Sequence, residues 1–451
     1  MRLRFAFTYL LFFQFMTPIS VLAQSHDNNI LQFIVRWDNT YGMAKLDIPS
    51  DMDTIIHEVL TTKYIASNSN ICMSDSVGHF IFASNGLKVY DRNYNVMTNG
   101  DSISFPDQYS DFNAHLGATI DSSYYTKSTN AIPLPGKKDE YIFFHTTIYI
   151  DDLFRYQYAL RYTRIDMKID DGLVIEKNVL LSPNTTQLPL LIKHGNGIDW
   201  WLITAHGRSN TFYSYLINND GIVGPMSMQV GTEMDSNLWY KGTYDFHDLK
   251  SSTDGSIILS QKENFFDLFS FDRCAGILDY LRKIDQSNIA DNRIIGGSEI
   301  SPSADYYYYS QGRNFFQVDL KATENPIVKL GHITSLSTPH ISFIRIINDK
   351  FILGTYRVEN IVLPYLALIS EPDLPGPSCQ LNLNMFYEFP IQSPVGIFGQ
   401  IPSIPNYRLG NVENYSDENC KNVFFDRALE PVSEFIFHGS KYYPLIRKFK
   451  E

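Results

Sequence analysis

The sequence is poor in charge and lacks the motifs that identify the common enzyme classes. Charged residues make up 19% of its 451 residues and hydrophobic residues 44%, which excludes disorder caused by charge and low hydrophobicity. It contains no H-E-x-x-H zinc motif, G-x-S-x-G nucleophile elbow, P-loop or G-x-G-x-x-G dinucleotide motif. We therefore predict no catalytic, cofactor-binding or metal-binding residue, and no cofactor.

Cysteine is scarce as well. Cys72, Cys274, Cys379 and Cys420 are too few and too far apart for a disulfide scaffold or a zinc C-x-x-C pair. If the chain is exported, as argued below, one bridge is allowed. We expect it between Cys379 and Cys420, which flank a proline-rich C-terminal stretch. The alternative is that all four are small buried thiols.

Positive charge is also in short supply. The formal net charge is -12, and removing Arg2 and Arg4 with the N-terminal leader changes it to -14. An acidic surface repels phosphate backbones, and the basic cluster Arg447-Lys448-Lys450 is too short to reverse this, so we expect no nucleic-acid partner. After the leader no run of 18 apolar residues occurs, so no transmembrane segment is expected either.

The first 23 residues have the three parts of a secretory signal peptide. Arg2 and Arg4 precede an apolar stretch over 5–15, and the small-residue ending 21–23 follows Pro18. The apolar stretch is shorter than the ~20 residues that a membrane span needs. We expect cleavage after Ala23 and a secreted or cell-surface location.

Weak internal periodicity is the most informative feature of the rest of the chain. A short apolar strand, a turn and a second strand of alternating apolar and polar residues recur about every 53 residues, close to the ~40–50 residues of a propeller blade. The anchors of the repeat are Ile34, Phe80, Tyr141, Trp200, Ile257, Tyr306 and Phe351. The prediction is an all-β fold: a single β-propeller over residues 24–400, with about seven four-stranded blades, six or eight being the alternatives.

The second strands of this repeat end on short polar residues. These residues are Asp47, Asp91, Asp166, Asn218, Asp272, Asp319 and Ser370. A short side-chain acceptor after a strand can bond the next backbone N–H groups in an Asx-type turn. We therefore interpret these positions as turn caps and not as catalytic groups.

Two loops sharpen the prediction. The stretches 249–256 and 299–306 look like the S-P-D-G loop of WD-repeat-like and lactonase-like propellers. Together with 268–276, 372–379 and 404–410, they resemble a group of exported bacterial propeller proteins that use type IX secretion. The resemblance implies an immunoglobulin-like domain and a C-terminal sorting domain after the propeller.

The segment after the predicted propeller departs from that group. Residues 401–451 are fewer than the ~100 that an independent β-sandwich needs. We expect a short irregular C-terminal tail, which is either a remnant of the following domain or the truncated end of a longer reading frame. On this resemblance, we expect the usual C-terminal sorting domain to be lacking.

Several clusters are candidate functional sites. Asp245 to Asp248 supplies at most two convergent metal ligands, and the carboxylate pairs Asp151-Asp152 and Asp170-Asp171 lie in turn-like contexts. The aromatic runs Trp200-Trp201 and Tyr306 to Tyr309 could stack sugars or peptides, but packing between blades is the preferred interpretation.

The function predicted from these observations is that of an exported, monomeric, non-enzymatic propeller. It would bind or scaffold an extracellular or cell-surface partner, a protein or a glycan, at its loop-rich face. The alternative is a hydrolase or lyase, lactonase-like or glycan-cleaving, with an acidic or metal site in the central channel. A fold alone does not decide between them.

Overall fold

The structure is a computed structural model whose described residues are almost entirely β-strands. They comprise 30–37, 40–47, 56–61, 71–75, 79–103, 126–150, 156–169, 171–183, 185, 189–206, 209–233, 248–262, 264–286, 295–324, 326–332, 340–347, 351–358, 361–386, 405–413, 415–416, 420, 435–438 and 441–444. One 3₁₀ turn, η2 (Gly376–Cys379), is the exception within these ranges. Over the same ranges, no helix has the length and hydrophobicity to cross a membrane.

Five antiparallel sheets have four strands each, hydrogen-bonded in chain order. We call each sheet a blade and name it by its first and last strands. The strands are β7 (Thr126–Pro133), β8 (Glu140–Ile150), β9 (Tyr156–Asp166) and β10 (Leu173–Ser182); β11 (Leu190–Lys193), β12 (Trp200–Ala205), β13 (Thr211–Asn218) and β14 (Gly221–Gln229); β15 (Leu249–Ser251), β16 (Ile257–Gln261), β17 (Phe265–Asp272) and β18 (Ile277–Asp285); β19 (Ile295–Ile300), β20 (Tyr306–Gln311), β21 (Asn314–Asp319) and β22 (Ile327–His332); and β23 (His340–Ile347), β24 (Phe351–Val358), β25 (Ile361–Ile369) and β26 (Leu381–Phe386).

The remaining strands form smaller sheets. Two sheets have three strands, and a C-terminal hairpin has two. These strands are β1 (Ile30–Trp37), β2 (Thr40–Asp47) and β3 (Ile56–Thr61); β4 (Ile71–Ser74), β5 (Phe80–Ser84) and β6 (Val89–Tyr90); and β27 (Phe435–His438) with β28 (Lys441–Pro444).

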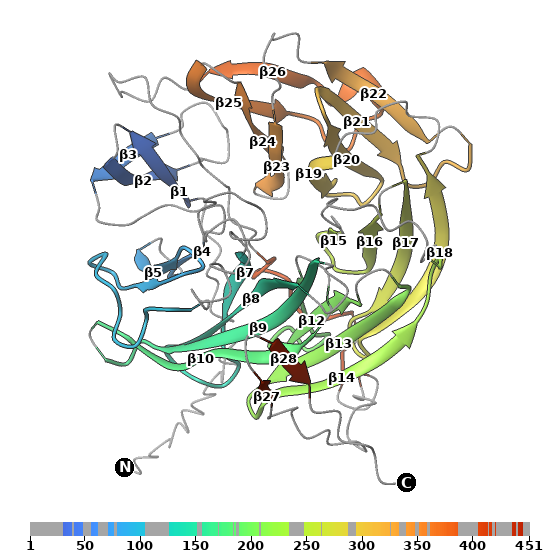
Figure 1. The fold of residues 1–451 in the computed structure, drawn as a ribbon. Coiled ribbons are helices and arrows are strands. Elements are labelled where there is room, and N and C mark those ends of the chain that lie inside the picture. The colour runs from blue at the N-terminus through green and yellow to red at the C-terminus, as the bar shows by residue number, and fades with distance from the viewer. Residues whose placement is uncertain are drawn as a thin grey trace, which may run out of the picture.

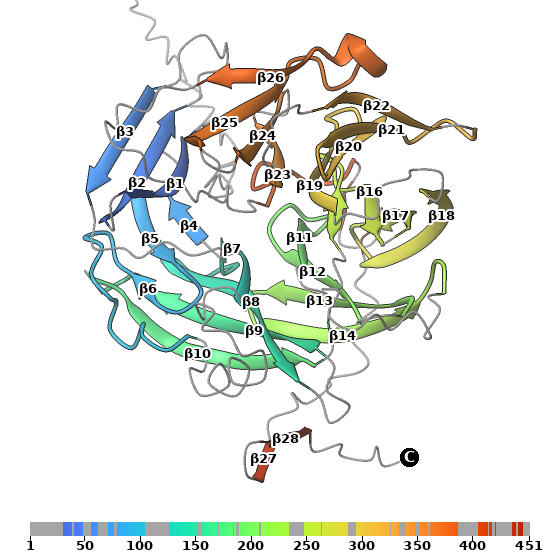
Figure 2. The same ribbon diagram turned by 45° about the horizontal axis from the view of Figure 1, so that its top comes forward.

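The four-stranded blades stand around a ring with their first strands toward its centre (Figures 1 and 2). Strand β11 contacts β15, β15 contacts β19, and β19 contacts β23. This radial arrangement of antiparallel meanders is a β-propeller, which confirms the predicted all-β propeller fold. The predicted number of about seven four-stranded blades is wrong, because the described residues form five.

The two three-stranded sheets occupy the rest of the ring (Figure 2). In the second of them, the chain after β6 turns at Asp91 and bonds back to the strand that it has just left. The amide of Val89 donates to Gly100 O at 2.7 Å, and the amide of Ile103 donates to Leu87 O at 2.9 Å. A compact turn therefore occupies the position where a fourth strand was expected.

The aromatic runs are packed between blades, as the sequence indicated. In β12, Trp200 lies in the core shared with blade β7–β10 and Trp201 lies in the core shared with blade β15–β18. In β20, Tyr307 and Tyr309 face blade β15–β18, whereas Tyr308 packs with residues of blade β23–β26. Both faces of these central strands are buried, which explains their continuous apolar character.

The predicted turn caps are confirmed at five of their seven positions. Asp166, Asn218, Asp272 and Asp319 each end a third strand and Asp91 directly follows β6. All five accept backbone N–H bonds from residues two to four positions later, at 2.8 to 3.1 Å. The side chain of Asp47 lies outside the described set, and no cap bond is found for Ser370. These side chains are committed to holding turns.

Candidate functional site

The connections of the meander define two faces of the ring. Since successive turns of an antiparallel sheet alternate between its ends, the first and third turns of each blade share one face. Hydrogen bonds between neighbouring blades support this: Thr253 Oγ1 donates to Pro302 O at 2.8 Å, and the amide of Ser303 donates to Asp373 Oδ1 at 2.8 Å. We call this side the strap face, after the C-terminal segment described next, and the other side the opposite face.

A segment that follows the last blade in sequence lies across the strap face. This strap comprises residues 405–413, 415–416 and 420. Asn406 Nδ2 donates to Thr253 O at 2.7 Å in blade β15–β18, and the Tyr407 hydroxyl donates to Ala131 O on β7. The Tyr407 ring is 3% exposed and packs edge-on against Trp200, with ring centroids 5.7 Å apart. The strap thus joins three blades, β7–β10, β11–β14 and β15–β18.

Arg273, in the turn after β17, links the strap to the blades. Its guanidinium donates to Lys193 O at 2.9 Å, His194 O at 3.2 Å, Asp254 O at 3.3 Å and Gly410 O at 2.6 Å. Burial lowers its pKa to about 10, against the opposing attraction of Asp254. The arginine therefore satisfies four backbone carbonyls from two blades and the strap, which a shorter or less branched side chain could not do.

A disulfide fastens the end of the strap, and it corrects the predicted pairing of Cys379 with Cys420. Cys420 pairs with Cys274, whose Cα lies 4.8 Å away, whereas Cys379 is a buried free thiol in η2. The ring brings residue 274 close to residue 420 although 146 positions separate them. The alternative of four buried thiols is also wrong. The Cys420 end is further held by the bond from the Val412 amide to Gly195 O at 3.0 Å.

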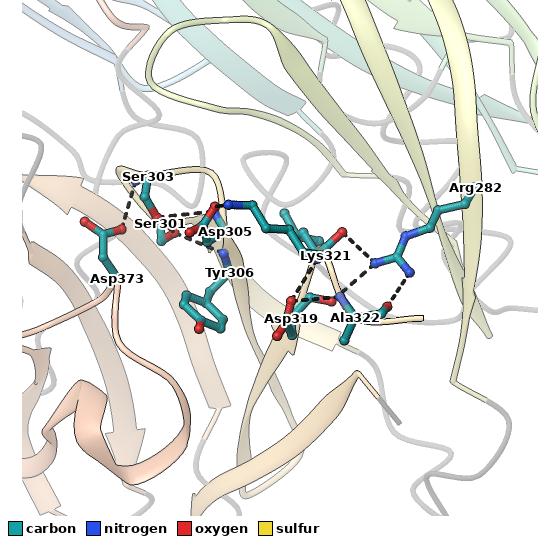
Figure 3. Close-up of polar contacts among 10 residues, drawn as sticks. Arg282, Ser301, Ser303, Asp305, Tyr306, Asp319, Lys321, Ala322 and Asp373 are labelled. Atoms are coloured by element: carbon teal, nitrogen blue, oxygen red, sulfur yellow. Dashed lines mark hydrogen bonds and ion pairs between the residues drawn. The ribbon is translucent and has the colours of Figure 1, made fainter. Parts of the chain in front are cut away.

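A second polar network on the strap face ties three blades together (Figure 3). Arg282 of β18 donates to the carbonyls of Leu320, at 2.6 Å, and Ala322 in the next blade. In that blade the Lys321 ammonium lies 2.5 Å from Asp305. Every bond drawn holds a turn or joins neighbouring blades, so we assign this network a structural role.

A polar cluster is buried within blade β7–β10. His145 and Arg161 face each other across β8 and β9, and the His145 ring lies 3.2 Å from Thr163 Oγ1. Asn178, at a register shift in β10, has a left-handed φ of 58°, and the Arg161 guanidinium donates to its carbonyl at 3.1 Å. His145 Nδ1 and the Asn178 amide group have no hydrogen-bond partner among the described residues. Burial, assisted by the Arg161 charge, lowers the pKa of His145 to about 3, so its ring is neutral.

A smaller polar group lies between the first strands of two blades. Asp248 Oδ2 lies 3.3 Å from the Lys250 ammonium and accepts a bond from the Ser298 hydroxyl at 3.3 Å. Leu249, between the two charged residues, is buried in the core shared with blade β11–β14, so by alternation Asp248 and Lys250 face blade β19–β22. This ion pair has the chemistry to orient a polar ligand but does not form a metal site with neighbouring acids.

Those remaining sequence candidates that the structure describes are not brought together as a centre. Asp171 lies in a turn and is 3.4 Å from Asn93 Nδ2, as its turn-like context predicted. Asp151, Asp152, Asp170 and residues 245–247 lie outside the described residues. No group of three or more metal-binding side chains occurs within the described ranges.

Sequence reasoning missed the strap and Arg273. The strap begins within the stretch 404–410 and Arg273 lies within 268–276, and the bonds of both go to backbone carbonyls. A backbone acceptor is present at every residue and leaves no pattern in the sequence. The one signal available was an arginine directly after a turn-capping aspartate.

Comparisons with known proteins return structures only. No protein-family model and no curated protein matches this sequence. A putative 6-phosphogluconolactonase from Bacteroides uniformis has 14% identity and a TM-score of 0.43, covering 75% of this chain and 92% of that chain. AztD from Citrobacter koseri has 11% identity and a TM-score of 0.37 over 84% and 90%. Hsv2p from Kluyveromyces lactis has 9% identity and a TM-score of 0.36 over 81% and 100%. Similarity at this level carries no argument about activity or ligand.

Proposed function

We propose that this chain is an exported binding or scaffolding propeller that recognises a protein or a glycan through its opposite face. The carrying observation is that the strap face is already occupied by the protein's own C-terminal segment, which is anchored by Arg273 and by the disulfide to Cys274. A partner of the ring would meet the other face.

The lengths of most connections support this choice of face, although the strap face also carries the longer third turns 320–326 and 370–380. On the strap face, the first turns of the four blades from β7 to β22 span five or six residues: 134–139, 194–199, 252–256 and 301–305. On the opposite face, the links between successive blades are longer, with 183–189, 230–248, 286–294 and 333–339. Long loops on a rigid scaffold are where recognition tends to reside.

The structural bonds of several described acidic groups support binding over acid–base catalysis. The aspartates that end the third strands accept backbone bonds, and Asp248 is paired with Lys250. General acid–base chemistry requires titratable groups that reach the substrate. We extend the proposal to export through the leader 1–23, to membership of the type IX secretion group and to a monomeric state.

Two matched charge reversals test the assignment of the face. Glu233 lies after β14 on the opposite face and Glu324 lies in a turn of the strap face, and both are exposed. Residues 24–451 are screened on glycan and surface-protein arrays, and the affinity of each hit is measured for Glu233→Lys and Glu324→Lys. We expect Glu233→Lys to change the affinity at least threefold and Glu324→Lys to leave it unchanged. The reverse order of effects would refute the proposal, as would turnover of a lactone or glycan by the wild type.

A further inference from the structure

The strap lies on the ring in the way that a peptide lies on a receptor, with two side chains inserted and the residue between them exposed. Tyr407 is buried in the core that contains Trp200, and Leu409 packs against the core on the other side of the same blade. Arg408, between them, is exposed. We call the part of the ring beneath residues 406–412 the strap seat.

Glycines in the strap seat allow the strap to approach the ring closely. A Cβ at Gly197 would lie 2.9 Å from the amide nitrogen of Asn411. A Cβ at Gly255 would lie 3.0 Å from Leu409 Cδ2. The equivalent turn of blade β19–β22 has a left-handed φ of 60° at Ala304, so this backbone conformation does not by itself require glycine. Glycine at these places in the seat leaves room for a chain lying on it.

The strap seat also offers hydrogen bonds to the backbone of the strap. Arg273 donates to Gly410 O at 2.6 Å, and Gly195 O accepts a bond from the amide of Val412 at 3.0 Å. Bonds of this kind are available to a peptide of any sequence. Selectivity among peptides would therefore come from the two inserted side chains.

The turns that form the strap seat are held by bonds of their own. Asn196 Oδ1 accepts bonds from the amides of Ile198 and Asp199 at 3.0 and 2.9 Å. In the other turn, the Asp254 carboxylate accepts the amide of Ser256 at 3.0 Å. Residues 405–413 contribute no strand to the blades. A seat preorganised in this way loses little conformational freedom when a peptide binds.

We infer that the strap seat is a peptide-binding site, and that the strap is a tethered ligand which a separate peptide of the same pattern can replace. The pattern is a tyrosine, any exposed residue, a leucine and a glycine, as at 407–410. A flexible tether gives its ligand an effective concentration on the order of millimolar, so the intact strap excludes peptides at micromolar concentration. This site is distinct from the partner site proposed on the opposite face.

Disulfide trapping tests the strap seat with the strap weakened. The host is residues 24–451 with Tyr407→Ala, Leu409→Ala and Cys420→Ser. The probe is a synthetic peptide of residues 404–420 whose Cys420 carries a thionitrobenzoate group. A seated peptide places this sulfur beside Cys274, whose thiolate displaces thionitrobenzoate and forms the disulfide. We expect this peptide to react at least about tenfold faster than a peptide with Tyr407→Ala and Leu409→Ala, because the inserted side chains dominate binding.

Two further substitutions in the host locate the bound peptide. Gly197→Ala places a methyl group against the backbone of the seated peptide and should slow trapping at least about threefold. Gly376→Ala is the matched control, because Gly376 has a left-handed φ of 53° and no atom within 4 Å of an added Cβ. It should leave the trapping rate unchanged. Circular dichroism checks that each variant is folded, and Cys420→Ser alone is the host if the triple variant does not fold.

Three results would overturn the inference. The first is an equal trapping rate for the two peptides on a folded host, and the second is an equal effect of Gly197→Ala and Gly376→Ala. The third is a disulfide-linked dimer of the host in place of the peptide adduct, which would identify a second copy of the chain as the occupant. None of them bears on the opposite face, which Glu233→Lys and Glu324→Lys test separately.

Discussion

The Arg273 guanidinium donates a 2.6 Å hydrogen bond to the carbonyl of Gly410, which lies 137 positions later in the chain. A charged donor shared among four carbonyls contributes more than a neutral hydrogen bond does, and its removal leaves the buried carbonyls of Lys193 and His194 unsatisfied. The strap and the turns of two blades consequently depend on a single side chain.

Arg273→Lys should destabilise the protein by about 2–4 kcal/mol, because an ammonium cannot reach carbonyls arranged around a planar guanidinium. Urea denaturation monitored by tryptophan fluorescence measures the change in the free energy of unfolding. The matched control is Arg92→Lys at an exposed position, which should stay within about 0.5 kcal/mol of the wild type. Equal effects of the two substitutions would contradict the role assigned to Arg273.

The disulfide predicts the number of reactive thiols. Denatured but unreduced protein should expose two thiols, Cys72 and Cys379, and reduced protein four. Alkylation followed by mass spectrometry counts them, and peptide mapping should find Cys420 linked to Cys274. Cys274→Ser/Cys420→Ser should lower the free energy of unfolding by about 2–4 kcal/mol. A Cys379–Cys420 peptide would disprove the pairing.

Gly255 occupies the fourth position of the turn 252–256 with a left-handed φ of 72°. A Cβ there would lie 2.9 Å from Ile192 Cγ2 and 3.0 Å from Leu409 Cδ2 of the strap. Gly255→Ala should therefore cost at least about 2 kcal/mol, the sum of backbone strain and overpacking. Thermal unfolding gives the comparison with the wild type.

Ala304 is the matched control for Gly255, because it has a φ of 60° in the equivalent turn of the next blade. In each turn the amide of the left-handed residue donates to the carbonyl of the serine three positions earlier, at 3.0 Å for Gly255 and 2.9 Å for Ala304. Ala304→Gly should be neutral or stabilising by up to about 1 kcal/mol, since relief of strain of ~1–2 kcal/mol outweighs the added freedom of the unfolded chain. A large loss of stability would show that the two turns are not equivalent.

His145 makes stability depend on pH. Its folded pKa of about 3 lies below the ordinary value of 6.5, so between these values the unfolded chain binds the proton that the folded protein does not. Stability should therefore fall by up to about 1.4 kcal/mol for each pH unit as the pH drops from 6.5 toward 3. Denaturation at pH 7, 6, 5 and 4 measures this slope. The slope of stability against pH should decrease in a folded His145→Gln variant. His79 is exposed, and His79→Gln should retain the slope of the wild type.

The sequence predicted those parts of the fold that rest on local side-chain patterns. Alternation and apolar runs located β12 and β20, and short polar residues located the third-strand turns, because these signals act within a few residues. The prediction of four strands in every blade was wrong after β6, where backbone hydrogen bonds between residues 87 and 103 replace a fourth strand.

The contacts that cross the ring could not be predicted from local sequence patterns. The partner of Cys420 depends on which blades the strap crosses, and the number of blades was itself uncertain at the sequence level. Lys193 ends an ordinary apolar strand, and its burial depends on Trp200 and on the strap far along the chain. Such positions are readable only once the blades are placed side by side.

The link between residues 274 and 420 also determines how the protein would carry mechanical load. A pull applied beyond residue 420 enters the propeller through the covalent bond at Cys274 in blade β15–β18, bypassing the chain between residues 275 and 419. Blades β19–β22 and β23–β26 are thereby shielded from tension and cannot be unravelled in order from the C-terminal end. After reduction, the same pull would first peel the strap from the ring.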